Sequence, residues 1–140
     1  MTTSYAVRRT INASPDKVWA LLTDAAGYPD WNTAVVSLHG TIAVGQTIRL
    51  VSVADPKRTF KLKVAELDRP SRMVWSSGMP FGLFRGVRTY SLRPAGENTE
   101  FAMEEMFSGP LAPLITKAIP DLTDSFEKFA DGLKRASERN

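Results

Sequence analysis

The fold is decided near the C-terminus, by the stretch LAPLITKAIPDLTDSFEKFADGL at residues 111–133. Apolar residues recur there every three, four or seven positions, which is the period of one face of an α-helix. The stretch also contains Pro120, but the apolar face stays in phase across it, so we expect one long helix with a kink at the proline. The residues of this face are Leu111, Leu114, Ile115, Ala118, Ile119, Leu122, Phe126, Phe129, Ala130 and Leu133.

The chain before this helix has the pattern of β-strands. Short runs of alternating apolar and polar residues occupy residues 5–11 and 34–108, separated by turns rich in Gly, Pro and Asp. Residues 14–16, Ser-Pro-Asp, carry the signals of a helix N-terminus, and residues 28–32 predict a turn or a second short helix. We therefore expect an α+β fold. A curved antiparallel seven-stranded sheet wraps on the long C-terminal helix, and two short helices lie between strands 1 and 2.

Length and composition indicate an ordinary globular protein. At 140 residues the chain suits one domain, residues 1–140, which would bury roughly two thirds of the surface that its unfolded form exposes. Cysteine is absent, which excludes disulfides and thiolate metal sites. The N-terminus lacks the pattern of a signal peptide, and no run of about 18 apolar residues occurs. We expect a cytoplasmic monomer or homodimer without stable membrane insertion.

The net charge of +3 comes from the middle of the chain, where residues 46–95 contain 10 Lys and Arg against 3 Asp and Glu. A nucleic-acid surface would need clustered cations with stacking aromatics, which this sequence does not show, so we expect no nucleic-acid partner. Many of the cations instead alternate with apolar neighbours and should lie on the outer face of the sheet. These are Arg49, Lys61, Lys63, Arg85 and Arg93.

One charged pair is predicted on the inner face. Setting Leu92 opposite Phe101 in the last two strands places Arg88 opposite Glu105 among apolar residues. A lone inward charge would be costly, and pairing removes most of that penalty. The pair either fixes strand register or anchors a ligand's carboxylate, hydroxyl or carbonyl group, and the sequence leaves both roles open.

The sequence contains no assembled catalytic or metal-binding set. His39 is the only histidine, and strand alternation directs it outward, so neither a zinc site nor a histidine-based triad is expected. No phosphate loop or dinucleotide fingerprint occurs, and we expect no cofactor, no metal and no dedicated catalytic residue. Any reaction would have to use groups such as Arg88, Glu105 and Tyr90.

Three motifs carry a family resemblance: INASPDKVW at residues 11–19, YPDWN at 28–32 and FSGPL at 107–111. With the order of elements, they make the chain similar to the helix-grip fold of the START and Bet v 1-like (SRPBCC) superfamily over nearly its whole length. Within it, the chain resembles the polyketide cyclase/dehydrase and lipid-transport group. The resemblance implies a hydrophobic cavity between sheet and helix that holds lipids, sterols, polyketides or similar molecules, often without catalysis.

The favoured function is therefore binding or carriage of a hydrophobic small molecule in that cavity. One alternative is a polyketide cyclase/dehydratase-type enzyme using Arg88 and Glu105. A second is an interaction module like the Hsp90-activator group, which has a similar first-helix region and would use the basic outer sheet. The predicted ligand-binding residues are Trp31, Val36, Leu50, Leu62, Trp75, Phe84, Arg88, Tyr90, Met103, Glu105, Phe107, Leu114 and Phe126.

Overall fold

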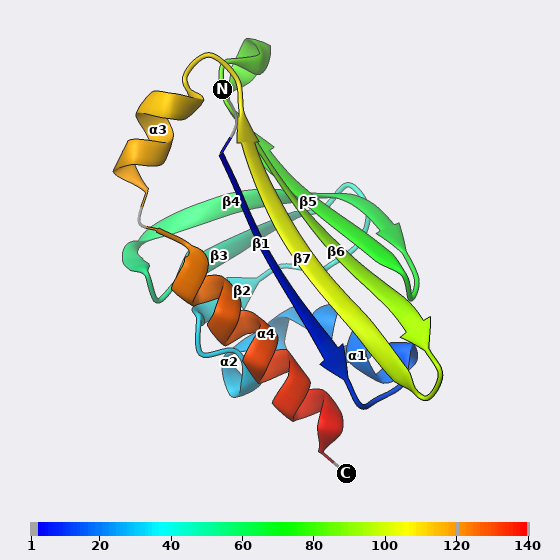
Figure 1. Ribbon diagram of the computed structural model, residues 1–140. Coiled ribbons are helices and arrows are strands. Elements are labelled where there is room, and N and C mark those ends of the chain that lie inside the picture. The colour runs from blue at the N-terminus through cyan, green and yellow to red at the C-terminus, as the bar shows by residue number, and fades with distance from the viewer. Residues whose placement is uncertain (1–2, 120, 140) are drawn as a thin grey trace.

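The computed structural model describes residues 3–119 and 121–139, and it confirms the predicted helix-grip α+β fold (Figure 1). The described strands form one antiparallel seven-stranded sheet in the order β1-β7-β6-β5-β4-β3-β2. The strands are β1 (Thr3–Ile11), β2 (Val35–His39), β3 (Thr47–Ser52), β4 (Asp55–Asp68), β5 (Arg72–Gly78), β6 (Arg85–Ala95) and β7 (Asn98–Ser108). The helices are α1 (Pro15–Leu22), α2 (Tyr28–Trp31), α3 (Ala112–Ala118) and α4 (Thr123–Glu138), with 3-10 turns η1 (Ala25–Gly27) and η2 (Pro80–Gly82).

The first helix begins where its capping signals predicted. The side chain of Ser14 accepts a hydrogen bond from the backbone N–H of Lys17 at 3.3 Å, and Pro15 occupies the first turn. The helix buries Val18 and Leu22 as part of the core. The short helix α2 follows, and it completes the pair of helices expected between strands 1 and 2.

The C-terminal segment differs from the predicted single kinked helix, because it is divided into α3 and α4. The first of these ends at Ala118, and Ile119 has extended backbone angles of φ −93° and ψ 136°. A residue that precedes proline is disfavoured in the helical region, which accounts for the break. Pro120 itself, the predicted site of the kink, lies outside the described residues.

The two helices consequently cover different parts of the sheet. Figure 1 shows α4 running along the concave side, while α3 lies beyond it, at the end of the sheet where β1 begins and β7 ends. Helix α4 packs on β1, α1 and α2. Its apolar residues Phe126, Phe129, Ala130 and Leu133 are buried in the core.

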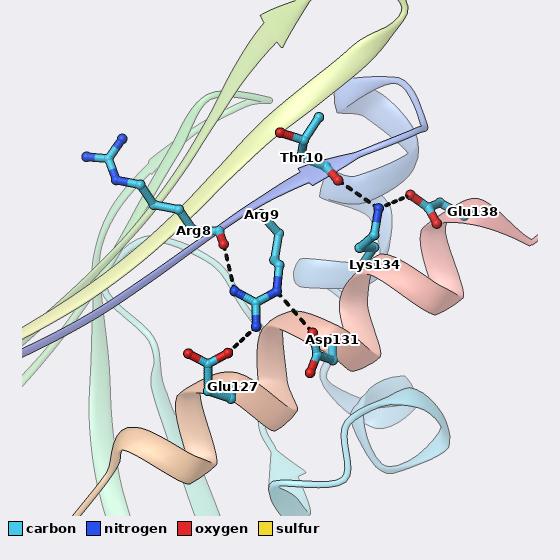
Figure 2. A network of polar contacts seen from close by, with 7 residues as sticks. All are labelled: Arg8, Arg9, Thr10, Glu127, Asp131, Lys134 and Glu138. Atoms are coloured by element: carbon cyan, nitrogen blue, oxygen red, sulfur yellow. Dashed lines mark hydrogen bonds and ion pairs between the residues drawn. The ribbon is translucent and has the colours of Figure 1, made fainter.

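A polar network holds α4 against β1 (Figure 2). The guanidinium of Arg9 pairs with Glu127 and lies 3.0 Å, from Nε to Oδ1, from Asp131. The ammonium group of Lys134 donates to the carbonyl oxygen of Thr10 at 2.8 Å. Glu127 and Asp131 are about half exposed, so each ion pair contributes little on its own and the buried apolar face provides most of the stabilisation.

Helix α4 also makes a very close contact with the end of α2. A Cβ atom at Gly132 would lie 2.1 Å from the backbone oxygen of Trp31, so only glycine permits this approach. The contact brings Phe129 against the ring of Trp31, with centroids 5.4 Å apart, and against Tyr28 at 5.8 Å. Aromatic side chains therefore fill the sheet–helix interface beside α2.

Two further predictions concern the outside of the molecule. The predicted outward cations are all exposed on the strands or at their ends: Arg49, Lys61, Lys63, Arg85 and Arg93. No helix within the described residues is long and apolar enough to cross a membrane.

Candidate ligand-binding cavity

The predicted pairing of the last two strands is confirmed. In the β6–β7 register Leu92 lies opposite Phe101, and Arg88 lies opposite Glu105. The Nε atom of Arg88 donates to Oε1 of Glu105 at 2.9 Å, and Nη2 lies 2.7 Å from the same oxygen. The two side chains are only 15% and 12% exposed, so the pair lies on the inner face of the sheet.

Strand register places aromatic residues on both sides of this pair. Trp75 on β5 is the direct neighbour of Arg88, and Tyr5 on β1 is the direct neighbour of Glu105. The ring of Phe126 on α4 covers the row, with Arg88 Cζ 5.0 Å from its centroid. This distance suits a cation–π interaction, which is stronger where the cation is shielded from water.

The environment fixes the protonation states of two groups. Burial by itself lowers the pKa of Arg88, but Glu105 and Tyr90 outweigh it, and the pKa lies above its ordinary value. Burial raises the pKa of Tyr90, because it disfavours the phenolate, and the Arg88 cation offsets only part of that effect. Arg88 is thus a permanent cation and Tyr90 a neutral hydroxyl group at neutral pH.

A cavity of about 160 Å³ lies between the sheet and the junction of α3 with α4. An engineered protein cavity of about 150 Å³ is large enough for benzene, so this one has room for a single ring. Its wall is largely apolar, with Arg88 and Glu105 among the exceptions.

Most of the predicted ligand-binding residues lie on this wall: Leu50, Leu62, Trp75, Phe84, Arg88, Met103, Glu105, Phe107 and Phe126. Two others face inward but pack in the core instead. Trp31 and Tyr90 are 7% and 0% exposed and pack against Phe129, with ring centroids 5.4 and 5.6 Å from it. They support the wall without forming part of it.

Two predicted residues are placed wrongly by the sequence pattern. Val36 is 47% exposed, because a register shift between Val35 and Ser37 turns the strand by one residue and brings Val35 to the cavity. Leu114 is 70% exposed, because α3 is a separate helix that presents Ile115 to the cavity. Neither Val36 nor Leu114 belongs to the site.

The sequence analysis missed several lining residues. Arg58 is one of them: β4 begins at Asp55, and strand alternation places Arg58 on the same face as Phe60 and Leu62. Its guanidinium carbon lies 5.3 Å from the centroid of the Phe60 ring. The other missed residues are Ala34, Val35, Ser52, Phe60, Ser77, Gly86, Ile115, Ile119, Leu122, Ser125 and Phe129.

Gly86 shapes the wall through its lack of a side chain. A Cβ atom there would lie 3.2 Å from both Phe107 Cε1 and Ser77 Oγ. The glycine therefore lets the Phe107 ring lie close to β6, where it stacks on Phe84 with centroids 5.8 Å apart and planes inclined by 17°. A larger residue at this position would crowd the wall and reduce the cavity.

The described residues contain no cluster of three or more His, Cys, Asp or Glu side chains suited to a metal ion. His39 is exposed at the end of β2, as the alternation predicted. The polar residues of the cavity wall are Ser52, Arg58, Ser77, Arg88, Glu105 and Ser125.

Comparisons with known proteins agree with this architecture. A family model described as "Polyketide cyclase / dehydrase and lipid transport" matches residues 2–138. No curated protein matches the sequence.

Solved structures extend the comparison to the fold. Protein MLL2253 from Mesorhizobium loti is 21% identical over 96% of each chain, with a TM-score of 0.74. Truncated norcoclaurine synthase from Thalictrum flavum is 17% identical over 100% of this chain and 96% of its own, with a TM-score of 0.74. The di-domain ARO/CYC BexL from the BE-7585A biosynthetic pathway is 14% identical over 99% of this chain and 51% of its own, with a TM-score of 0.72. At these identities the structures share the fold.

Proposed function

The chain belongs to the polyketide cyclase/dehydrase and lipid-transport family of the SRPBCC superfamily, and on that premise we propose that it binds or carries a hydrophobic small molecule. The supporting observation is the apolar cavity of about 160 Å³ under the α3–α4 junction. Protein interiors are ordinarily close-packed. The apolar atoms that line this space lack the packing contacts that a bound apolar molecule would supply. Such a space is expected where a ligand fills it.

The shape of the wall limits what the ligand can be. Phe84, Phe107 and Phe126 present aromatic surface to one ring-sized apolar group. The remainder of a longer molecule would leave the cavity past partly exposed wall residues such as Phe60 and Ile119. The ligand is thus a cyclic or aromatic molecule, or a longer molecule that inserts one end.

Native mass spectrometry of protein purified from its own host tests this proposal. We expect a co-purified small molecule on the native protein. Gly86→Leu should remove it, because the new side chain enters the cavity beside Phe107. Thr89→Leu is the matched control, because Thr89 lies three residues along the same strand, opposite Glu104, with its side chain on the other face. Absence of any adduct, together with failure to bind added apolar ligands, would contradict the proposal.

A second candidate is an enzyme of the cyclase/dehydratase type. It is favoured by the position of Arg88 and Glu105 on the cavity wall, with Tyr90 beside them. In such a reaction the Arg88 guanidinium would stabilise negative charge on a substrate carbonyl oxygen. The carboxylate of Glu105 would accept the proton from the adjacent carbon, leaving an enolate for ring closure.

Kinetics with a poly-carbonyl substrate separate this candidate from simple binding. Glu105→Gln retains the shape of the side chain and removes the base, so turnover should be lost while ligand uptake remains measurable. Turnover that is unchanged in Glu105→Gln would exclude the enzymatic role of this residue.

A further inference from the structure

The hydrogen-bonding capacity of the buried ion pair is only partly used. Both contacting nitrogens of Arg88, Nε and Nη2, approach a single oxygen of Glu105, Oε1. Among the described residues Glu105 Oε2 accepts no hydrogen bond, and the Tyr90 hydroxyl is a second polar neighbour of Arg88. A guanidinium has five N–H donors and a carboxylate has about four acceptor positions, so each partner retains groups for a ligand. Both residues line the cavity.

One further donor lies next to this pair. The indole Nε1 of Trp75, a residue of the cavity wall, is buried and has no hydrogen-bond partner among the described residues. Trp75 lies directly opposite Arg88 in the β5–β6 register, so its indole N–H belongs to the same part of the wall as the pair. A buried donor without an acceptor costs about 1–3 kcal/mol. The ion pair and Trp75 therefore offer the cavity several N–H donors and the free carboxylate oxygen of Glu105.

We propose that the cavity selects a ligand whose polar end is a neutral group with an acceptor and a donor side by side. A primary amide, an enolised ketone and an undissociated carboxylic acid have this arrangement. The ligand's acceptor oxygen binds at Arg88, and its donor binds at Glu105 Oε2. This inference rests on the ligand-binding function proposed above, and it defines the chemical class of that ligand.

The charge balance of the site is the reason for preferring a neutral group. Glu105 already neutralises Arg88 across 2.7 Å, so the pair has no net charge to offer an anion. A carboxylate bound at Arg88 would lie close to Glu105 and be repelled by it, in a partly desolvated site where like charges cost several kcal/mol. An amide of the same shape avoids that repulsion and can donate to Glu105.

A second cation on the cavity wall could also bind an anionic ligand, so its contribution to carboxylate binding has to be removed. Arg58 is exposed, and it can hold an anion at the rim without any contact with the buried pair. The discriminating measurement is therefore made in protein carrying Arg58→Gln. The cavity volume of about 160 Å³ sets the probe size at one ring.

Benzamide and benzoate form the matched pair of probes, because they share a shape and differ in charge. Ethylbenzene serves as the apolar reference. Dissociation constants from protein-observed NMR titration near neutral pH should show benzamide binding at least about tenfold more tightly than benzoate. Equal or tighter binding of benzoate, with ethylbenzene still bound, overturns this inference and leaves the proposed function standing. Failure of all three probes to bind overturns both.

Removal of the Glu105 carboxylate should reverse the preference for benzamide over benzoate. In Arg58→Gln/Glu105→Gln protein, Arg88 is no longer neutralised, and benzoate should bind at least about tenfold more tightly than benzamide. An unchanged preference for benzamide contradicts the assigned role of Glu105. If that protein does not fold, Arg58→Gln/Arg88→Met/Glu105→Leu removes the pair without leaving a charge. Benzamide should then lose about tenfold in affinity while ethylbenzene loses none, and retained benzamide affinity overturns the proposal.

Discussion

The buried pair of Arg88 and Glu105 leads to a quantitative prediction about stability. Their side chains are 15% and 12% exposed, and Phe126 covers Arg88 from the helix side. Arg88→Met leaves the carboxylate of Glu105 without its partner, and Glu105→Leu leaves the guanidinium of Arg88 in the same condition. Breaking a buried ion pair typically costs 3–5 kcal/mol. We expect about 3 kcal/mol for each variant, because the cavity beside the pair lets water solvate the remaining charge.

The double variant Arg88→Met/Glu105→Leu should be far more stable than either single variant. It leaves no unpaired charge and fills a similar volume with apolar atoms, so its free energy of unfolding should lie within about 1 kcal/mol of the original protein. Urea unfolding of the four proteins, followed by far-UV circular dichroism, gives the coupling energy. The reasoning would be refuted if each single variant lost less than about 1 kcal/mol of unfolding free energy and the double variant lost the sum of the two.

Three other predictions concern the rest of the fold. Gly132→Ala should lower the free energy of unfolding by about 2 kcal/mol or more, because its Cβ would lie 2.1 Å from Trp31 O. Helix propensity alone predicts the opposite, so a rise in melting temperature would contradict this contact. Burial raises the pKa of Tyr28 and Tyr90, so near pH 10 these tyrosines lose their protons only in the unfolded state. Because that ionisation favours the unfolded state, the free energy of unfolding should fall as pH rises above about 10. Phenolate absorbance that reports ionisation of both tyrosines in folded protein at that pH would exclude this burial. Arg9→Met should lower the free energy of unfolding by less than about 1 kcal/mol, and by less again in high salt, since the partners of Arg9 are half exposed. A loss measured by urea unfolding that does not change with salt would contradict this prediction.

The sequence pattern was sufficient to predict the strands, the first two helices and the register of one strand pair. The β6–β7 pairing could be predicted because a tight turn joins two long alternating strands, which fixes every partner, including Arg88 and Glu105. The cap at Ser14 could be predicted because its hydrogen bond is local. Local signals and period-two alternation thus placed the ion pair on the inner face.

Features that depend on backbone irregularity or on tertiary packing were not predictable. The bulge that turns Val36 outward interrupts alternation without a distinctive residue. Leu114 is exposed because the break at Ile119 makes α3 a helix of its own, with an orientation different from that of α4. Alternation directs Tyr90 inward, but packing against Phe129 decides that it fills the core and does not line the cavity.

The central claim, a cavity that accepts an apolar small molecule, is tested most directly by a crystal structure of the protein soaked with ethylbenzene. We expect electron density for the ring in the cavity, in contact with Phe84, Phe107 and Phe126. A cavity closed by these side chains, with no density for the ligand at saturating concentration, would contradict the account.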